Sequence, residues 1–227
     1  MHKTKIRFLA AILCMALLAL CACGSLATPE ETTAPAADAP TLPIAPASYR
    51  DAPEAYWPVL DDLRKCIYLA ENYRDYNIRD DWGLTPGIEM LLDSLLSMSG
   101  EYIGYAVQDI NADGTPELII LFSPPGDKLH PCALFTLQDS APVHLYTYHF
   151  REVGSITADG IIYVSYATAP GGNMRSYRLE PGAAQLTLLT NYDYLLRFDD
   201  EEEILALQKE HCNPPNPMQL TFIPIEQ

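Results

Sequence analysis

The hydrophobic period of the chain changes at Gly100, and this change limits the fold more than any other feature. Before Gly100, apolar residues recur every three or four positions, which is typical of helices that pack by one face. After it, short runs of β-branched, aromatic and leucine residues are separated by turn residues, which is typical of strands. The sequence therefore predicts helices first and a sheet after them.

Two helices are predicted before this change. Pro58 fits the first turn of the first helix, where a missing N–H costs nothing. The second helix is predicted to begin after Thr85, as its N-cap, and to end at Gly100. The apolar stripes consist of Tyr56, Leu60, Leu63, Ile67 and Ala70 in the first helix, and of Ile88, Leu91, Leu92, Leu95 and Leu96 in the second.

The remainder of the chain predicts an antiparallel meander. Strands are expected at residues 102–108, 117–123, 133–138, 143–150, 161–167, 175–180 and 185–190. Tight turns such as Asp159-Gly160 favour direct antiparallel connections. A helix over residues 201–210, capped by Asp200, and a strand at 220–223 follow. The predicted fold class is α+β: two N-terminal helices, an antiparallel β meander, one C-terminal helix and a closing strand.

Residues 1–22 have the pattern of a secretory signal peptide. Lys3, Lys5 and Arg7 precede the uncharged apolar run 8–20, which is shorter than the roughly 20 residues of a membrane-spanning helix. Residues 23–48 are rich in Ala, Pro and Thr, which predicts an extended spacer. Residues 49–227 then form a single α+β domain.

The sequence Leu20-Cys21-Ala22-Cys23 resembles the lipobox of bacterial lipoproteins. The resemblance implies cleavage before Cys23 and a diacylglyceryl group on its thiol. Two acyl chains anchor a protein stably where one does not. We therefore expect a lipid-anchored chain on the extracytoplasmic face of the cell membrane, with the membrane as its first partner.

Charge and cysteine content exclude several classes of function. The chain has 14 basic and 30 acidic residues and a net charge of −16, which opposes binding to nucleic acid. Beyond the signal and Cys23, Cys66, Cys132 and Cys212 are an odd number with no CxxC pair, which indicates neither a zinc site nor a disulfide framework. Either one bridge forms among them, or all three are buried thiols.

The sharpest local motif is an acidic loop between two predicted strands. Asp109, Asn111 and Asp113 occupy positions 1, 3 and 5, and Gly114 occupies position 6, as in loops that wrap a Ca²⁺ ion. Position 12 is Ile120 in place of the bidentate glutamate of an EF-hand, so an EF-hand is excluded. The motif predicts a calcium loop of another kind.

This strand–loop–strand motif resembles the calcium loops of FG-GAP and VCBS-type β modules. The resemblance implies four side-chain ligands and one carbonyl ligand: Asp109, Asn111, Asp113 and Glu117, with the carbonyl of Thr115. It departs from the family in Glu117, where aspartate is usual. The alternative is a plain hairpin turn, in which Asp109 and Asn111 cap backbone amides. With the lipobox and spacer, the motif also resembles a group of Firmicutes surface lipoproteins, which implies a location and no activity.

No catalytic residue is assigned, because the histidines show no HExxH spacing and the serines no GxSxG motif. Tyr146 and Tyr148 share one face of a predicted strand, which suits stacking on sugars or peptides as well as ordinary sheet packing. The favoured hypothesis is a non-enzymatic binding or structural lipoprotein, stabilised by one calcium ion, with an unknown extracellular ligand or protein partner. The alternatives are an extracellular hydrolase of wall or glycan material and an accessory subunit of a cell-envelope assembly.

Overall fold

A computed structural model describes residues 49, 51–72, 83–95, 102–126, 128–149, 151–167, 171–195 and 200–225. The contacts of the chain divide it into two units, Met1–Ala39 and Pro40–Gln227, and every described residue belongs to the second. The predicted signal peptide, Cys23 and the predicted spacer lie outside the described residues. In the part that is described, no helix has both the length and the apolar character needed to cross a membrane.

The predicted fold class, α+β, is confirmed, with helices at both ends of a run of antiparallel strands. The elements are η1 (Glu54–Tyr56), α2 (Trp57–Asn72), α3 (Ile88–Leu95), β1 (Ile103–Gln108), β2 (Glu117–Phe122), β3 (His130–Gln138), β4 (Ala141–Thr147), β5 (Glu152–Ile156), β6 (Ile161–Ala167), β7 (Gly171–Leu179), β8 (Leu186–Leu195), α4 (Glu201–Cys212) and β9 (Ile223–Pro224).

The strands form two sheets. Sheet A has the order β4-β3-β2-β1-β9, and sheet B has the order β5-β6-β7-β8. Each consecutive pair within a sheet is antiparallel, as the short turns predict. The meander therefore leaves sheet A after β4 and continues as sheet B, and β9 returns to pair with β1.

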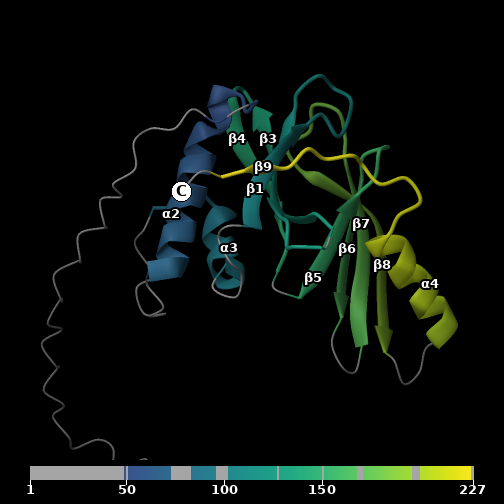
Figure 1. Cartoon of the computed structure of the whole chain (residues 1–227). Coiled ribbons are helices and arrows are strands. Elements are labelled where there is room, and N and C mark those ends of the chain that lie inside the picture. The colour runs from purple at the N-terminus through teal and green to yellow at the C-terminus, as the bar shows by residue number, and fades with distance from the viewer. Residues whose placement is uncertain are drawn as a thin grey trace, which may run out of the picture. The chain divides into compact units, whose positions relative to one another are not determined.

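Sheet A lies between the N-terminal helices and sheet B, and β2 shows this most clearly. Leu118 and Ile120 pack with α2 and α3, whereas Ile119 and Leu121 pack with sheet B, and all four side chains are fully buried. Figure 1 shows α2 and α3 beside the strands of sheet A, and α4 beside those of sheet B. A strand buried on both faces reads as a continuous apolar run, because neither face needs polar side chains.

The helix-side core fills the space between α2, α3 and sheet A, and the inter-sheet core lies between the two sheets. The helix-side core includes Tyr56, Leu60, Leu63, Ile67, Ile88, Leu91, Leu118, Ile120 and Phe135. The inter-sheet core includes Ala106, Ile119, Leu121, Leu134, Tyr148, Ile156, Ile162, Val164 and Leu179. A smaller cluster joins Ile204 of α4 to Met174 and Tyr194 of sheet B.

The second helix begins differently from the sequence prediction. The carbonyl of Thr85 accepts from Ile88 N and Glu89 N at 3.0 and 3.3 Å, but its side chain does not cap the helix. The backbone N and Oγ1 of Thr85 both donate to Asp62 Oδ2 of α2, at 2.8 and 2.6 Å, and α3 begins at Ile88. The side chain of Thr85 therefore ties the two helices together. In contrast, Asp200 is the predicted N-cap of α4, accepting from the amides of Glu202 and Glu203. Gly100, the predicted end of the second helix, lies outside the described residues.

Tyr148 is part of the inter-sheet core, where its ring fills the space above Gly154 of β5. A Cβ atom on Gly154 would lie 2.0 Å from the Cε1 atom of this ring, so only glycine leaves room for it. Tyr146 contacts Tyr148 edge-on, with ring centroids 5.0 Å apart. Because Tyr148 is buried, its role is sheet packing, which was the alternative to stacking on sugars or peptides.

Candidate functional site

The acidic loop runs from Asp109 to Glu117 and connects β1 to β2 as a hairpin. Gly114 has a φ of 89° and Ala112 a φ of 59°, so the chain turns back twice in the left-handed region. This conformation favours glycine, which explains the residue at position 6 of the motif. It also brings the side chains at positions 1, 3 and 5 close to the amides that follow them.

Asp109 and Asn111 accept hydrogen bonds from backbone amides within the loop. The Asp109 carboxylate accepts from Asp113 N at 3.2 Å and from Gly114 N at 2.9 Å. The Asn111 Oδ1 atom accepts from Asp113 N at 3.1 Å. These bonds satisfy the amides of the turn, as the hairpin alternative requires.

Asp113 connects the loop to sheet B. Its Oδ1 accepts from Thr115 N at 2.7 Å, and its Oδ2 accepts from Gly182 N at 2.7 Å in the turn between β7 and β8. Partial burial acts to raise the pKa of Asp113, but the amides of Gly182 and Thr115 outweigh it and hold the pKa below its usual value. The charged carboxylate therefore joins the β1–β2 loop of sheet A to the β7–β8 turn of sheet B.

Glu117 has a different environment from the other loop acids, because its side chain is fully buried. Its Oε2 accepts from Ile110 N at 2.9 Å, and its Oε1 accepts from Thr136 Oγ1 at 3.0 Å. Burial raises the pKa of Glu117 to about 7, and the negative charges of Asp113 and Asp109 act in the same direction. The carboxyl group thus serves as an internal hydrogen-bond acceptor at the start of β2.

The five residues predicted as calcium ligands are therefore divided by the structure. Asp109, Asn111 and Asp113 gather around the turn, Thr115 donates its amide to Asp113, and Glu117 faces Thr136. Among the residues that the structure describes, no three His, Cys, Asp or Glu side chains are grouped closely enough to hold a metal ion. Calcium binding by this loop stays a prediction.

The cysteines offer no reactive thiol in the described core. Cys66 and Cys132 are free and buried, and burial raises the pKa of each thiol to about 12. A thiol with such a pKa is protonated at neutral pH and is a poor nucleophile. The side chain of Cys212 and all of Cys23 lie outside the described residues, so lipidation of Cys23 stays a prediction.

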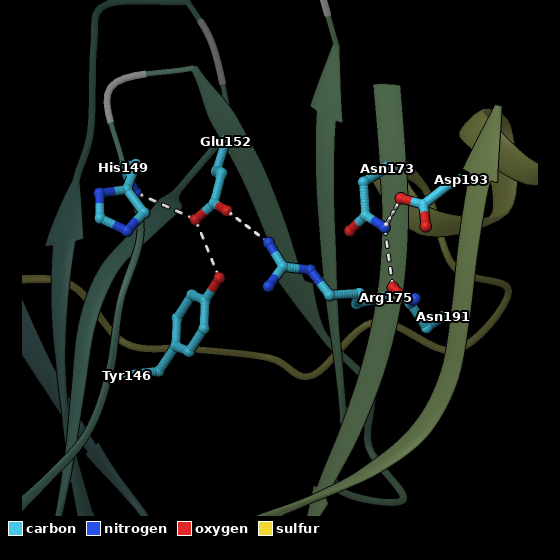
Figure 2. A network of polar contacts seen from close by, with 7 residues as sticks. All are labelled: Tyr146, His149, Glu152, Asn173, Arg175, Asn191 and Asp193. Carbon is cyan, nitrogen blue, oxygen red and sulfur yellow. Dashed lines mark hydrogen bonds and ion pairs between the residues drawn. The ribbon is translucent and has the colours of Figure 1, made fainter. Parts of the chain in front are cut away.

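A second polar cluster, which the sequence did not predict, lies between β4, β5 and β7 (Figure 2). The side chain of Glu152 is only 4% exposed, and its Oε1 pairs with Arg175 Nη2 at 2.8 Å. Its Oε2 accepts from Tyr146 Oη at 2.9 Å and from His149 N at 3.0 Å. A buried carboxylate that accepts from three donors, one of them an arginine, is fixed in position.

No protein-family model matches the sequence, and neither a curated protein nor a solved structure matches it.

Proposed function

We propose that this chain is a lipid-anchored extracytoplasmic lipoprotein whose α+β unit serves as a binding or structural module. The observation that carries the non-enzymatic part is the position of Glu117. Its pKa of about 7 suits a general acid or base, but the side chain is fully buried and both carboxyl oxygens accept internal hydrogen bonds. A substrate would have no access to this group.

The anchoring part is supported by the lipobox-like sequence around Cys23 and is tested by metabolic labelling. Cells that express the full chain are grown with an alkyne analogue of palmitate, and the label is read after click chemistry. We expect label and membrane association for the natural chain and for the Cys21→Ala control, because Cys21 is out of register with the lipobox. Cys23→Ala should remove both. Label retained by Cys23→Ala would contradict the assignment.

Calcium is proposed as a stabiliser of the acidic loop. A carboxylate has about four lone-pair positions, so the hydrogen bonds accepted by Asp109 and Asp113 leave oxygen positions for a cation. A bound Ca²⁺ would also offset the repulsion between the loop acids, which contributes to the raised pKa of Glu117. Because Asp113 holds Gly182, the ion would strengthen the connection between the two sheets.

Calcium removal and titration of the full chain test this proposal. After treatment with EGTA, added CaCl₂ should raise the melting temperature. The free energy of unfolding should rise by about 2.7 kcal/mol at a calcium concentration 100 times the dissociation constant. Asp109→Asn and Asp113→Asn should weaken the response, whereas Asp139→Asn, in the exposed turn between β3 and β4, should not. No binding heat and no thermal shift at millimolar calcium would contradict the proposal.

A further inference from the structure

One face of sheet B carries a regular array of planar polar side chains. In the antiparallel register, Asn173 of β7 lies opposite Asp193 of β8, and Arg175 lies opposite Asn191. Residues directly opposite share a face of the sheet, and so do residues two apart in one strand. Tyr166 of β6 continues the row opposite Asn173. We call these five residues, Tyr166, Asn173, Arg175, Asn191 and Asp193, the polar face.

The polar face is open to solvent at the β8 edge. Asn191 and Asp193 are exposed, and the Arg175 side chain is 30% exposed. Further along the same face, Ile162 is fully buried against sheet A. The face therefore changes from apolar, where sheet A covers it, to polar at the β7 and β8 side chains that Figure 2 labels, of which Asn191 and Asp193 are exposed.

Hydrogen bonds within the polar face hold its side chains in place. Asn173 Nδ2 donates to Asn191 Oδ1 at 2.7 Å and to Asp193 Oδ1 at 2.6 Å. Arg175 is fixed by its ion pair with the buried Glu152. Because these side chains are already ordered, a ligand that bound them would lose less free energy to side-chain ordering.

The face also has hydrogen-bonding capacity that the protein does not use. Asn173 Oδ1, an acceptor, and Arg175 Nε, a donor, are buried and have no hydrogen-bond partner. Among the described residues, Asp193 Oδ2 and Asn191 Nδ2 make no hydrogen bond either. Buried polar atoms without partners are rare, and an ordered water is one partner that would satisfy them. The exposed atoms open to a ligand are Asp193 Oδ2 and Asn191 Nδ2.

The donor and acceptor pattern selects the class of ligand. A hydroxyl group donates and accepts at once, which matches alternating acceptors and donors on one surface. Arg175 is neutralised by Glu152, and Asp193 adds a negative charge in a chain of net charge −16, so anions are opposed. The ring of Tyr166, half-buried in the same row, offers an apolar surface beside the polar groups.

We propose that the polar face binds a neutral carbohydrate, with Asn191 and Asp193 as hydrogen-bonding residues at its exposed end. The inference rests on the proposed role of the chain as a surface module, because such a position faces extracellular glycans. The sugar hydroxyls bind Asp193 Oδ2 and Asn191 Nδ2, and the apolar side of a sugar ring packs on Tyr166.

The test measures binding of the detergent-solubilised full chain to neutral tetrasaccharides of N-acetylglucosamine, glucose and mannose, by oligosaccharide array and then by titration calorimetry. We expect at least one of them to bind. Asn191→Ala and Asp193→Ala should each weaken that binding about tenfold. Thr187→Ala is the matched control, because Thr187 is an exposed polar residue of β8 on the opposite face, and it should leave binding unchanged.

Absence of binding to all three sugars would overturn the inference. Equal binding by the natural chain, Asn191→Ala and Asp193→Ala would overturn it too. Binding of inorganic phosphate or of a basic peptide in place of every sugar would overturn it as well. Thermal melts of each variant show whether the fold is retained, and Asp193→Asn, which keeps the side-chain shape, replaces any alanine variant that does not fold. Palmitate labelling of Cys23 is independent of these results, so failure of the sugar test leaves the anchoring proposal standing, and the reverse also holds.

Discussion

The Glu117→Gln substitution is expected to raise the free energy of unfolding by about 3 kcal/mol at pH 8 and to leave it nearly unchanged at pH 4. The carboxyl pKa is raised from 4.5 to about 7 by burial, and each pKa unit corresponds to about 1.36 kcal/mol. Glutamine resembles the protonated acid: its amide can accept from Ile110 N and donate to Thr136 Oγ1. It therefore keeps both hydrogen bonds without a buried charge.

The sign of the pH dependence follows from the direction of the shift. Between pH 4.5 and about 7, the folded chain keeps the proton on Glu117 while the unfolded chain releases it. Stability contributed by this group is therefore complete below pH 4.5, falls as the pH rises, and is lost above about pH 7. Glutamine does not titrate, so its contribution stays constant.

Urea unfolding of the full chain in EGTA, at intervals from pH 4 to pH 8, measures this difference. The control is Glu180→Gln, which removes an exposed carboxylate in the β7–β8 turn and keeps every other acid of this strongly acidic chain. The difference in unfolding free energy between Glu180→Gln and the natural chain should vary little with pH. If Glu117→Gln changed the free energy of unfolding equally at pH 4 and at pH 8, the raised pKa of Glu117 would be contradicted.

Ile119→Ala and Ile120→Ala are expected to destabilise the fold to similar extents, by about 2–5 kcal/mol each. Ile119 belongs to the inter-sheet core and Ile120 to the helix-side core, and both are fully buried. Because β2 lies at the centre of sheet A, the two cores share one strand. Either substitution should therefore lower the urea concentration at the midpoint of a single, common unfolding transition.

Circular dichroism in the far ultraviolet and tyrosine fluorescence, followed through the same urea titration, test this pair. Leu205→Ala on α4 is the control, since its side chain is 56% exposed and its loss should cost little. Two separate transitions in either variant would show that the layers unfold independently. A loss of unfolding free energy as small as that of Leu205→Ala would show that the cores are not filled as described.

Local patterns in the sequence were sufficient for the fold class and for most elements. The stripe of Tyr56, Leu60 and Leu63 is the buried face of the first helical region, because a helix with one apolar face must cover a core. The run at residues 118–122 became a central strand, as its continuous apolar character indicates.

The division into two sheets was not predictable from these local patterns. β5 was missed, because Glu152–Ile156 has only Val153 and Ile156 as strong strand formers and includes Gly154. Its place in the fold depends on pairing with β6 and on the contact between Gly154 and the ring of Tyr148. Such tertiary contacts leave little trace in a five-residue window.

The candidate sites show the same limit. The turn around Asp109, Asn111 and Asp113 was predicted, because short polar side chains and Gly114 have local roles. The interior position of Glu117 was not, because it depends on Thr136 of β3. The polar face combines residues of β6, β7 and β8, and only their register brings them together.

Strand β9 has a consequence for the order of folding. Tyr105 pairs with Ile223, and Ile225 enters the helix-side core, so the edge of β1 is covered only when residues near the end of the sequence arrive. Until then, β1 presents unpaired amide and carbonyl groups, which are a template for association with another chain. In a chain synthesised from its N-terminus onward, strands β1 to β4 therefore become available before β9, and until β9 pairs, the edge of β1 is unprotected.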